Sequence, residues 1–394
     1  DGNTLFRLSL HVRQVGHTLL VGPTGAGKSV HLCCIEAAFR GYENARVIIF
    51  DNGASSKVLT YGVGGTFYDL GNEKSALSFQ PLAHIDDLNE MQWAQEWLCD
   101  FLIGENLTVT PSHKEKIRDA LSTLAGLDIQ LRTITNFRNS LQSEELKTAF
   151  SPLVLYDDQG NPGEYGQIFD SDQDTLEISA WQTFEMGKIM QQRAIIGPVL
   201  MYIFHRIETK LKNFSEGEDH RRQPTLIVLD ECWMFFDNPL FAAKIEDWLR
   251  TLRKYDASVV FATQSLDDIV KSPLLDIVLG SCPSHIFLPD GSAMEPEKAK
   301  VYERFKLNRR QIEIIASSVP QKHYYYTSPE GSRRYDLALE HCPFTLAYVA
   351  VNKEGLALCN KILREYGAEE FNVHWMNAHK LSFPKRLRKE EAIL

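Results

Sequence analysis

The chemistry that the sequence offers first is phosphate binding, in the stretch GPTGAGKS at residues 22–29. It fits the pattern G-x-x-x-x-G-K-[ST], whose glycines let backbone N–H groups curl around phosphates at the positive end of a helix. The lysine of this pattern reaches the β- and γ-phosphates, and the hydroxyl binds Mg²⁺. We therefore predict a site for a nucleoside triphosphate and Mg²⁺. The predicted nucleotide-binding residues are Gly22, Pro23, Thr24, Gly25, Ala26, Gly27, Lys28, Ser29 and Val30.

A second component of the site is expected at the end of another buried strand, and the stretch TLIVLDE at 225–231 supplies it. Asp230 would join Ser29 as a partner of the metal ion. Glu231 follows at the carboxyl end of the strand, where a carboxylate can orient the attacking water or accept its proton. An acid in this position favours hydrolysis over phosphoryl transfer to another acceptor. Lys28 and Glu231 are thus predicted catalytic residues.

The strand-like run SVVFATQ ends in Thr263 and Gln264. Taken alone, a glutamine after a strand is more often a residue at the start of a helix. After a phosphate loop and an Asp-Glu strand, Gln264 is better interpreted as a sensor of the γ-phosphate.

Arginine is the remaining component that stabilises the charge of a phosphoryl-transfer transition state, and it often comes from a neighbouring subunit. Arg206 and Arg253 are the favoured candidates because they precede the strands that carry Glu231 and Gln264. Arg193 and Arg250 are further candidates. Each arginine has the alternative interpretation of a solvated helix residue.

The elements that must position these residues follow an α/β pattern. Apolar runs at 18–22 and 46–51 predict buried parallel strands around a helix at 29–40. Residues 84–150 carry helical periodicity with almost no strand signal, which predicts an all-α insertion. We therefore expect an α/β core that carries the phosphate loop, with a mainly parallel sheet flanked by helices. The expected divisions are 1–83 (first segment of the core), 84–156 (all-α appendage), 157–345 (second segment of the core) and 346–394 (C-terminal strand, helix and tail).

Further along the chain, strands are expected at 176–182, 258–263 and 285–288, and a long helix at 188–211. The stretches HYYYTS and RRYDLAL predict a hairpin, and FTLAYVAV at 344–351 predicts another strand. The three tyrosines at 324–326 could contact a nucleobase, although alternating packing in a strand is the favoured interpretation. The last 15 residues are interpreted as a charged tail.

Composition limits the function classes. The net charge of −10, from 42 basic and 52 acidic residues, argues against a protein that binds nucleic acid over its whole surface. Seven scattered cysteines without a CxxC pair indicate a reduced, intracellular protein. The most apolar run, at 194–204, is too short to span a bilayer.

The sequence resembles the C-terminal ATPase domain of the type IV secretion and conjugation ATPases, the TrbE/CagE group, within the FtsK/HerA-like branch of RecA-type motors. The resemblance covers residues 1–290 well and the last hundred more loosely. It rests on the stretches VGPTGAGKS, FDNGAS, FEM at 184–186, GPVLMYIFHRIE, PTLIVLDECWMFF and WLRTLRKYDASVVFATQSLDDI.

The resemblance implies a RecA-like P-loop fold for the core. It also implies ATP as the nucleotide and the same roles for Lys28, Ser29, Asp230, Glu231 and Gln264. It also implies Arg206 and Arg253 as contacts to phosphate or across subunits. Self-association, often into hexamers, is expected, with partners among the inner-membrane components of a secretion or conjugation apparatus. Relatives carry an N-terminal domain of comparable size, so this chain, which begins at Asp1, is interpreted as an isolated ATPase domain. We expect it in the cytoplasm, peripheral to the bacterial inner membrane through those partners or that domain.

Two other functions remain open. A DNA-translocating motor or coupling protein predicts stimulation by DNA, and the basic stretches at 219–223 and 384–389 could bind its phosphates. The acidic balance weighs against this interpretation, so DNA is not favoured as a partner. A scaffold that binds ATP without turnover is the third hypothesis. Glu231 argues against it, since a pure switch needs no acid to activate water.

Overall fold

The structure is a computed structural model that describes residues 4–71, 77–216, 223–233, 239–272 and 275–381. By compactness the chain divides into two units, and each is described by itself. Unit 1 comprises Asp1–Phe67, Ser179–Glu185 and Gly217–Leu394, and unit 2 comprises Tyr68–Ile178 and Met186–Glu216.

A nine-stranded sheet runs in the order β3-β4-β2-β5-β6-β1-β7-β8-β9. From β4 to β7 the neighbouring strands pair in parallel, and the hairpin β8–β9 joins the edge at β7 in antiparallel orientation. The strands are β1 (Thr18–Val21), β2 (Arg46–Asp51), β3 (Thr66–Asp69), β4 (Trp181–Glu185), β5 (Thr225–Leu229), β6 (Ala257–Thr263), β7 (Ser284–Phe287), β8 (His323–Ser328) and β9 (Gly331–Asp336).

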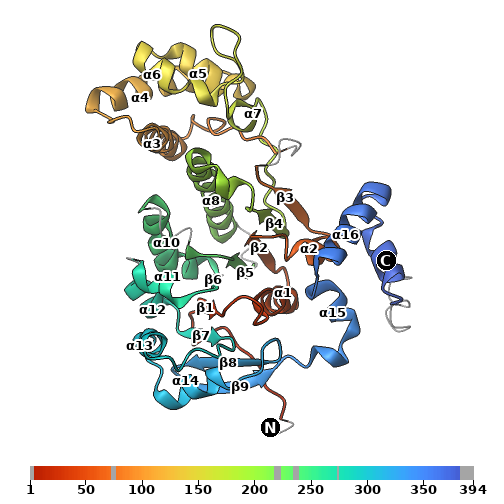
Figure 1. Cartoon of the computed structure of the whole chain (residues 1–394). Coiled ribbons are helices and arrows are strands. Elements are labelled where there is room, and N and C mark those ends of the chain that lie inside the picture. The colour runs from red at the N-terminus through yellow and green to blue at the C-terminus, as the bar shows by residue number, and fades with distance from the viewer. Residues whose placement is uncertain (1–3, 72–76, 217–222, 234–238, 273–274, 382–394) are drawn as a thin grey trace. The chain divides into compact units, whose positions relative to one another are not determined.

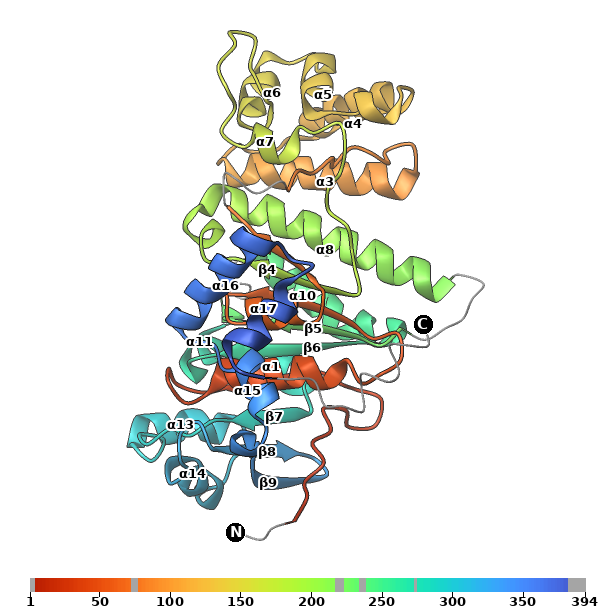
Figure 2. The same cartoon turned by 90° about the vertical axis from the view of Figure 1, so that its right-hand side faces the viewer.

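The central strands are buried along their whole length, which is why their sequences are continuous apolar runs rather than alternating ones. One face packs Leu20, Val47, Val228 and Val260 into a core with the helices of that side. Those helices are α1 (Lys28–Phe39), α2 (Lys57–Gly62), α15 (Pro343–Val349), α16 (Lys353–Tyr366) and α17 (Phe371–Ala378). Figures 1 and 2 show α1 and α15 side by side against this face.

The alternate residues of the same strands, such as Leu19, Ile48 and Phe261, are also buried and point to the opposite face. Figure 1 shows α10, α11 and α12 on that side. The remaining helices of unit 1 are α10 (Pro239–Thr251), α11 (Leu266–Lys271), α12 (Leu275–Ser281), α13 (Pro296–Arg304) and α14 (Arg309–Ala316). The expected parallel sheet with helices on both faces is therefore confirmed.

One expected strand is wrong. The run at 344–351 lies mostly in helix α15, which begins at Pro343 and buries Tyr348 and Val349. Proline is well suited to the first turn of a helix, and a short apolar run cannot be assigned to strand or helix by periodicity alone. The strand expected at 176–182 is found slightly later, as β4. The expected tail lies almost wholly outside the described residues.

Unit 2 is helical, as predicted for residues 84–150. Its helices are α3 (Leu88–Gly104), α4 (Pro111–Ala125), α5 (Ile134–Ser140), α6 (Glu144–Ala149), α7 (Gly166–Phe169) and α8 (Arg193–Glu216). Helix α3 packs against α4 and α8, and the indole of Trp97 donates to the carbonyl of Pro198 at 3.0 Å. That carbonyl belongs to the proline inside α8, which was expected as a long helix and belongs to unit 2 by compactness. Among the described residues, no helix has the length and apolar character needed to cross a membrane.

Candidate active site

The phosphate-binding sequence lies where it was expected, between the end of β1 and the first residue of α1. Gly27 caps the helix with a φ of 104° and Gly25 has a φ of 82°, a left-handed region that favours glycine. A Cβ on Gly27 would lie 2.9 Å from the hydroxyl of Tyr324 and 3.1 Å from the Cα of Gln321. Backbone conformation and space therefore both require glycine at this position.

Lys28 brings the two predicted halves of the site together. Its ammonium group bonds to Asp230 at 2.6 Å and also bonds to Glu231. Both carboxylates follow β5, and the N–H of Asp230 donates to the carbonyl of Phe50 on β2. Since β1, β5 and β2 run parallel in one sheet, their carboxyl ends meet at one edge, where the three charges lie buried.

Gln264 extends this network from the end of β6. Its amide nitrogen donates to Glu231 at 2.7 Å, and its amide oxygen accepts from the hydroxyl of Thr24 in the phosphate loop. The indole of Trp233 donates to the other oxygen of Glu231 at 3.1 Å. A chain of hydrogen bonds thus joins the phosphate loop to the residue predicted to activate water, through the predicted sensor.

One positive and two negative charges are buried together in this network, and burial disfavours the charged form of each group. Burial raises the pKa of Asp230, while the positive charge of Lys28 acts in the opposite direction. Burial alone would lower the pKa of Lys28, but the charges of Asp230 and Glu231 outweigh it and raise that pKa. A phosphate bound in the loop would compete with both carboxylates for the same ammonium group.

The oxygens near the phosphate loop are compatible with Mg²⁺, but they are too few to hold an ion without a bound phosphate. Among the described residues, no group of three or more histidine, cysteine, aspartate or glutamate side chains could hold a metal. Mg²⁺ usually keeps several waters and binds through one or two protein oxygens plus substrate phosphates. Ser29 and Asp230 supply oxygens of that kind.

Gln321 holds the phosphate loop from a distant region of the sequence. Its backbone N–H donates to the carbonyl of Ala26 at 2.9 Å, and its side-chain amide donates to the carbonyl of Gly25 at 3.1 Å. Tying these carbonyls fixes the orientation of the peptide units in the loop. No motif indicates this role, because Gln321 lies in an ordinary turn between α14 and β8.

Two of the stretches that carried the family resemblance meet beside the site. Glu185, in FEM at the end of β4, accepts from the N–H groups of Gly53 at 3.1 Å and Ala54 at 2.5 Å. Asp51, in FDNGAS at the end of β2, accepts from the Ser55 hydroxyl at 2.7 Å and the Ser56 N–H at 2.9 Å. Two carboxylates therefore fix the turn that follows β2.

Glu36 is a further acid beneath this turn, on helix α1. It is completely buried, accepts from the hydroxyl of Ser56 at 3.1 Å, and its second oxygen has no hydrogen-bond partner among the described residues. Burial, and then the charge of Asp51, raises the pKa of Glu36 to about 8. Burial, followed by the charges of Glu185 and Asp230, raises the pKa of Asp51 to about 7.

None of the arginine candidates is among the described residues that line the cavity of the phosphate loop. Arg206 belongs to unit 2, where it forms an ion pair with Asp174 at 3.3 Å. Arg253 is exposed in a short 3₁₀ turn (Leu252–Tyr255) before β6. It therefore lies at the amino ends of the parallel strands, whereas the phosphate loop lies at their carboxyl ends. Arg250 pairs with Glu246 of its own helix, and the side chain of Arg193 lies outside the described residues. The arginine roles therefore stay predictions.

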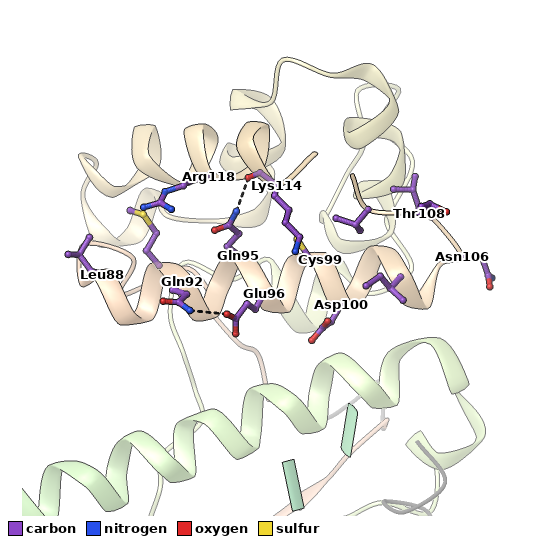
Figure 3. A pocket seen from close by; sticks show the side chains of 14 residues that line it. Leu88, Gln92, Gln95, Glu96, Cys99, Asp100, Asn106, Thr108, Lys114 and Arg118 are labelled. Carbon is purple, nitrogen blue, oxygen red and sulfur yellow. Dashed lines mark hydrogen bonds between the residues drawn. The ribbon is translucent and has the colours of Figure 1, made fainter. Parts of the chain in front are cut away.

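The phosphate loop lines a cavity of about 800 Å³, which has the size of a small-molecule site. Its lining includes every residue from Pro23 to Val30 except Ala26, together with several residues of the stretch 336–352; among its described residues there is no arginine. A second cavity, of about 970 Å³, lies in unit 2 beside α3 and α4. Figure 3 shows Glu96, Asp100, Lys114 and Arg118 among its mixed lining. It has no glycine loop to hold phosphates.

The comparisons with known proteins agree with this geometry. The family model of the TraG P-loop domain matches residues 138–326. The solved VirB4 of Thermoanaerobacter pseudethanolicus shares the fold, with a TM-score of 0.59 at 15% identity over 82% of this chain and 89% of that one. The coupling protein TrwB with ADP and Mg²⁺ reaches 0.51 at 16% identity, over 82% and 85%. The fold and site thus define a RecA-like P-loop domain of the NTPase class.

Curated sequences narrow the class. A probable conjugal transfer protein TrbE of Sinorhizobium fredii is 38% identical over 95% of this chain and 55% of its own length. Conjugal transfer protein TrbE of Rhizobium radiobacter is 39% identical over 95% and 44%. The chain is a homologue of the TrbE and VirB4 proteins of conjugation and type IV secretion. It spans about half the length of the curated relatives it matches.

The substitution Gln321→Asn tests the hold on the phosphate loop. Asparagine tolerates the left-handed backbone of this residue, φ 62°, but its amide is one methylene too short to reach Gly25. Loss of one such hydrogen bond costs about 0.5–1.5 kcal/mol, so nucleotide binding should weaken about three- to tenfold. Calorimetric titration with ATP measures the change. The exposed Gln130→Asn is the control, and equal affinities for all three proteins would contradict the role of Gln321.

The substitution Glu36→Gln tests the buried acid through the pH dependence of stability. The folded chain keeps the proton of Glu36 up to about pH 8, whereas an unfolded chain loses it near the ordinary pKa of 4.5. The stability that this proton contributes is complete below that value and is lost as the pH rises towards 8. Glutamine stays neutral at every pH. The unfolding free energy of the variant, relative to that of the wild type, should therefore rise by up to about 1.4 kcal/mol per pH unit.

Urea unfolding at pH 5, 6, 7 and 8 measures this difference in unfolding free energy. The exposed Glu43→Gln is the matched control and should keep a constant difference from wild type. If the difference in unfolding free energy between Glu36→Gln and the wild type is also independent of pH, Glu36 is ionised in the folded chain.

Proposed function

We propose that this chain hydrolyses ATP to ADP and phosphate, and that turnover powers conjugative transfer or type IV secretion as a domain of a longer protein. The observation that carries the proposal is the network of Lys28, Glu231 and Gln264 at the phosphate loop. An acid, a cation and an amide that faces both the loop and the acid are the components that hydrolysis of a γ-phosphate needs. The homology to TrbE and VirB4 proteins supports the biological setting.

In the proposed reaction the loop binds the phosphates, and Lys28 moves its charge from the two carboxylates to the β- and γ-phosphates. Glu231, released from Lys28, orients the attacking water and accepts its proton. Gln264 couples the presence of the γ-phosphate to Glu231 through the nitrogen and oxygen of its amide. Ser29 and Asp230 would hold Mg²⁺, which neutralises developing charge on the phosphates.

We propose self-association, often hexameric in the resembling family, because the cavity has no arginine among its described lining residues. A neighbouring copy can supply that charge, and the exposed Arg253 is available to do so. The other proposed partners are inner-membrane components of the apparatus, with the helical unit 2 as the surface they contact. The proposed location is therefore cytoplasmic and peripheral to the inner membrane.

A DNA-translocating motor is the alternative function. The fold that this chain shares with the TrwB coupling protein favours this function. At 16% identity, that likeness supports the fold alone. The basic stretches 219–223 and 384–389 lie almost wholly outside the described residues. The acidic charge balance keeps this function second.

The substitution Glu231→Gln tests the proposal. Removing the group that accepts the proton should lower kcat at least about 100-fold. The affinity for ATP should stay within about threefold, because the loop and Lys28 remain. Steady-state phosphate release and calorimetric ATP binding measure the two quantities. The exposed Glu369→Gln is the control and should match the wild type.

The same assay separates the alternatives when it is run across protein concentration, with and without single- and double-stranded DNA. A rate that rises steeply with concentration and ignores DNA supports a self-assembling secretion ATPase. Strong stimulation of the rate by DNA would instead favour the DNA-translocating motor. Tight ATP binding with a background rate in both proteins at every concentration would contradict hydrolysis and favour the scaffold.

A further inference from the structure

Part of the wall of the nucleotide cavity comes from the chain that follows strand β9. We call this segment, residues 337–352, the closing segment. It contributes Leu337, Leu339, Leu346, Val349 and Val351 to the cavity lining. The run contains helix α15, which was expected to be a strand, and no residue of it belonged to the predicted nucleotide site.

The position of α15 indicates which end of a bound nucleotide would lie against this wall. Helix α15 packs against α1, whose N-terminus begins in the phosphate loop. In a loop of this type the triphosphate lies along the helix N-terminus, with the α-phosphate near the first turn beyond the lysine and the hydroxyl residue. Ser29 and Val30 of that turn line the cavity together with the closing segment. The nucleoside that leaves the α-phosphate therefore meets the closing segment.

The chemistry of the wall suits a flat, weakly polar group. The leucines and valines that the closing segment contributes are aliphatic, and Leu337, Leu346 and Val351 retain accessible surface. Polar groups stand beside them: Asp336 accepts from the N–H of Ala338 at 2.8 Å, and the Lys322 ammonium lies 3.8 Å from its carboxylate. Small-molecule sites commonly combine an apolar wall with a few polar groups of this kind.

Tyr324, on strand β8, is also among the residues that line this cavity. Its ring is packed in strand β8 against Tyr335 at 5.7 Å, so packing in the strand accounts for the ring. Its hydroxyl is buried beside Gly27 and has no hydrogen-bond partner among the described residues. The hydroxyl therefore fills the space beside the phosphate loop that a Cβ at residue 27 would need.

We infer that the closing segment is the nucleoside-binding wall of this site: the base of the nucleotide lies on Leu337, Leu346 and Val351, while the phosphate loop binds the phosphates. The inference rests on the proposed function and adds where the chain distinguishes a nucleotide from a bare polyphosphate. The predicted nucleotide-binding residues 22–30 are then only half of the site, and the other half lies more than 300 residues further on.

The substitution Leu346→Gln tests the inference with two probes, Mg-ATP and inorganic tripolyphosphate. Leu346 is 38% exposed on a helix, and glutamine is a good helix former, so folding should be preserved. The change is neutral and leaves the electrostatic attraction for phosphates as it was. Leu127→Gln, at a leucine that is 41% exposed in unit 2, is the matched control. Calorimetry gives the Kd of each probe for each protein.

The expected result is a Kd for ATP about tenfold higher in Leu346→Gln, with the Kd for tripolyphosphate unchanged within twofold and the control like the wild type. An unchanged Kd for ATP would overturn the inference. An equal loss for both probes would also overturn it, because the closing segment would then act on the loop rather than on the nucleoside. A wild-type chain that binds neither probe would refute the proposed function itself, and the inference with it.

Discussion

The placement of one buried positive charge determines the arrangement of the site. Lys28 begins helix α1 and is 8% exposed, so its ammonium needs partners, and Asp230 and Glu231 provide them from the end of β5. Burying any one of these charges alone would cost several kcal/mol, so the three depend on one another. Phosphate groups can replace the carboxylates as partners of Lys28 because the exchange keeps the ammonium paired. In the proposed reaction the same exchange frees Glu231 to orient water.

The parallel sheet makes this pairing possible. Strands β1, β5 and β6 end at one edge, so residues more than 200 positions apart in sequence meet there in a fixed register. The turn after β2 is held by Asp51 and Glu185 at the same edge. Binding in the crevice at the carboxyl ends of strands is the general behaviour of open α/β sheets.

The sequence predicted the residues whose chemistry is written in short contiguous motifs. Lys28 could be predicted from its glycine-rich motif, Asp230 and Glu231 from their place at the end of an apolar run, and Gln264 from its place after them. Gln321 and Tyr324 could not, because their roles come from the way β8 folds back beside the phosphate loop. The run at 344–351, within the closing segment, was mistaken for a strand, since an apolar run of this length satisfies either structure. Arg206 and Arg253 stay predictions, because a residue that acts across subunits leaves no trace within one chain.

The most direct test of the central claim is the structure of this chain with Mg²⁺ and a non-hydrolysable ATP analogue. We predict that the ammonium of Lys28 bonds to the β- and γ-phosphate oxygens and has left Glu231, with the base against the closing segment. A structure in which Lys28 still bonds to both Asp230 and Glu231 while the nucleotide is bound would contradict the claim.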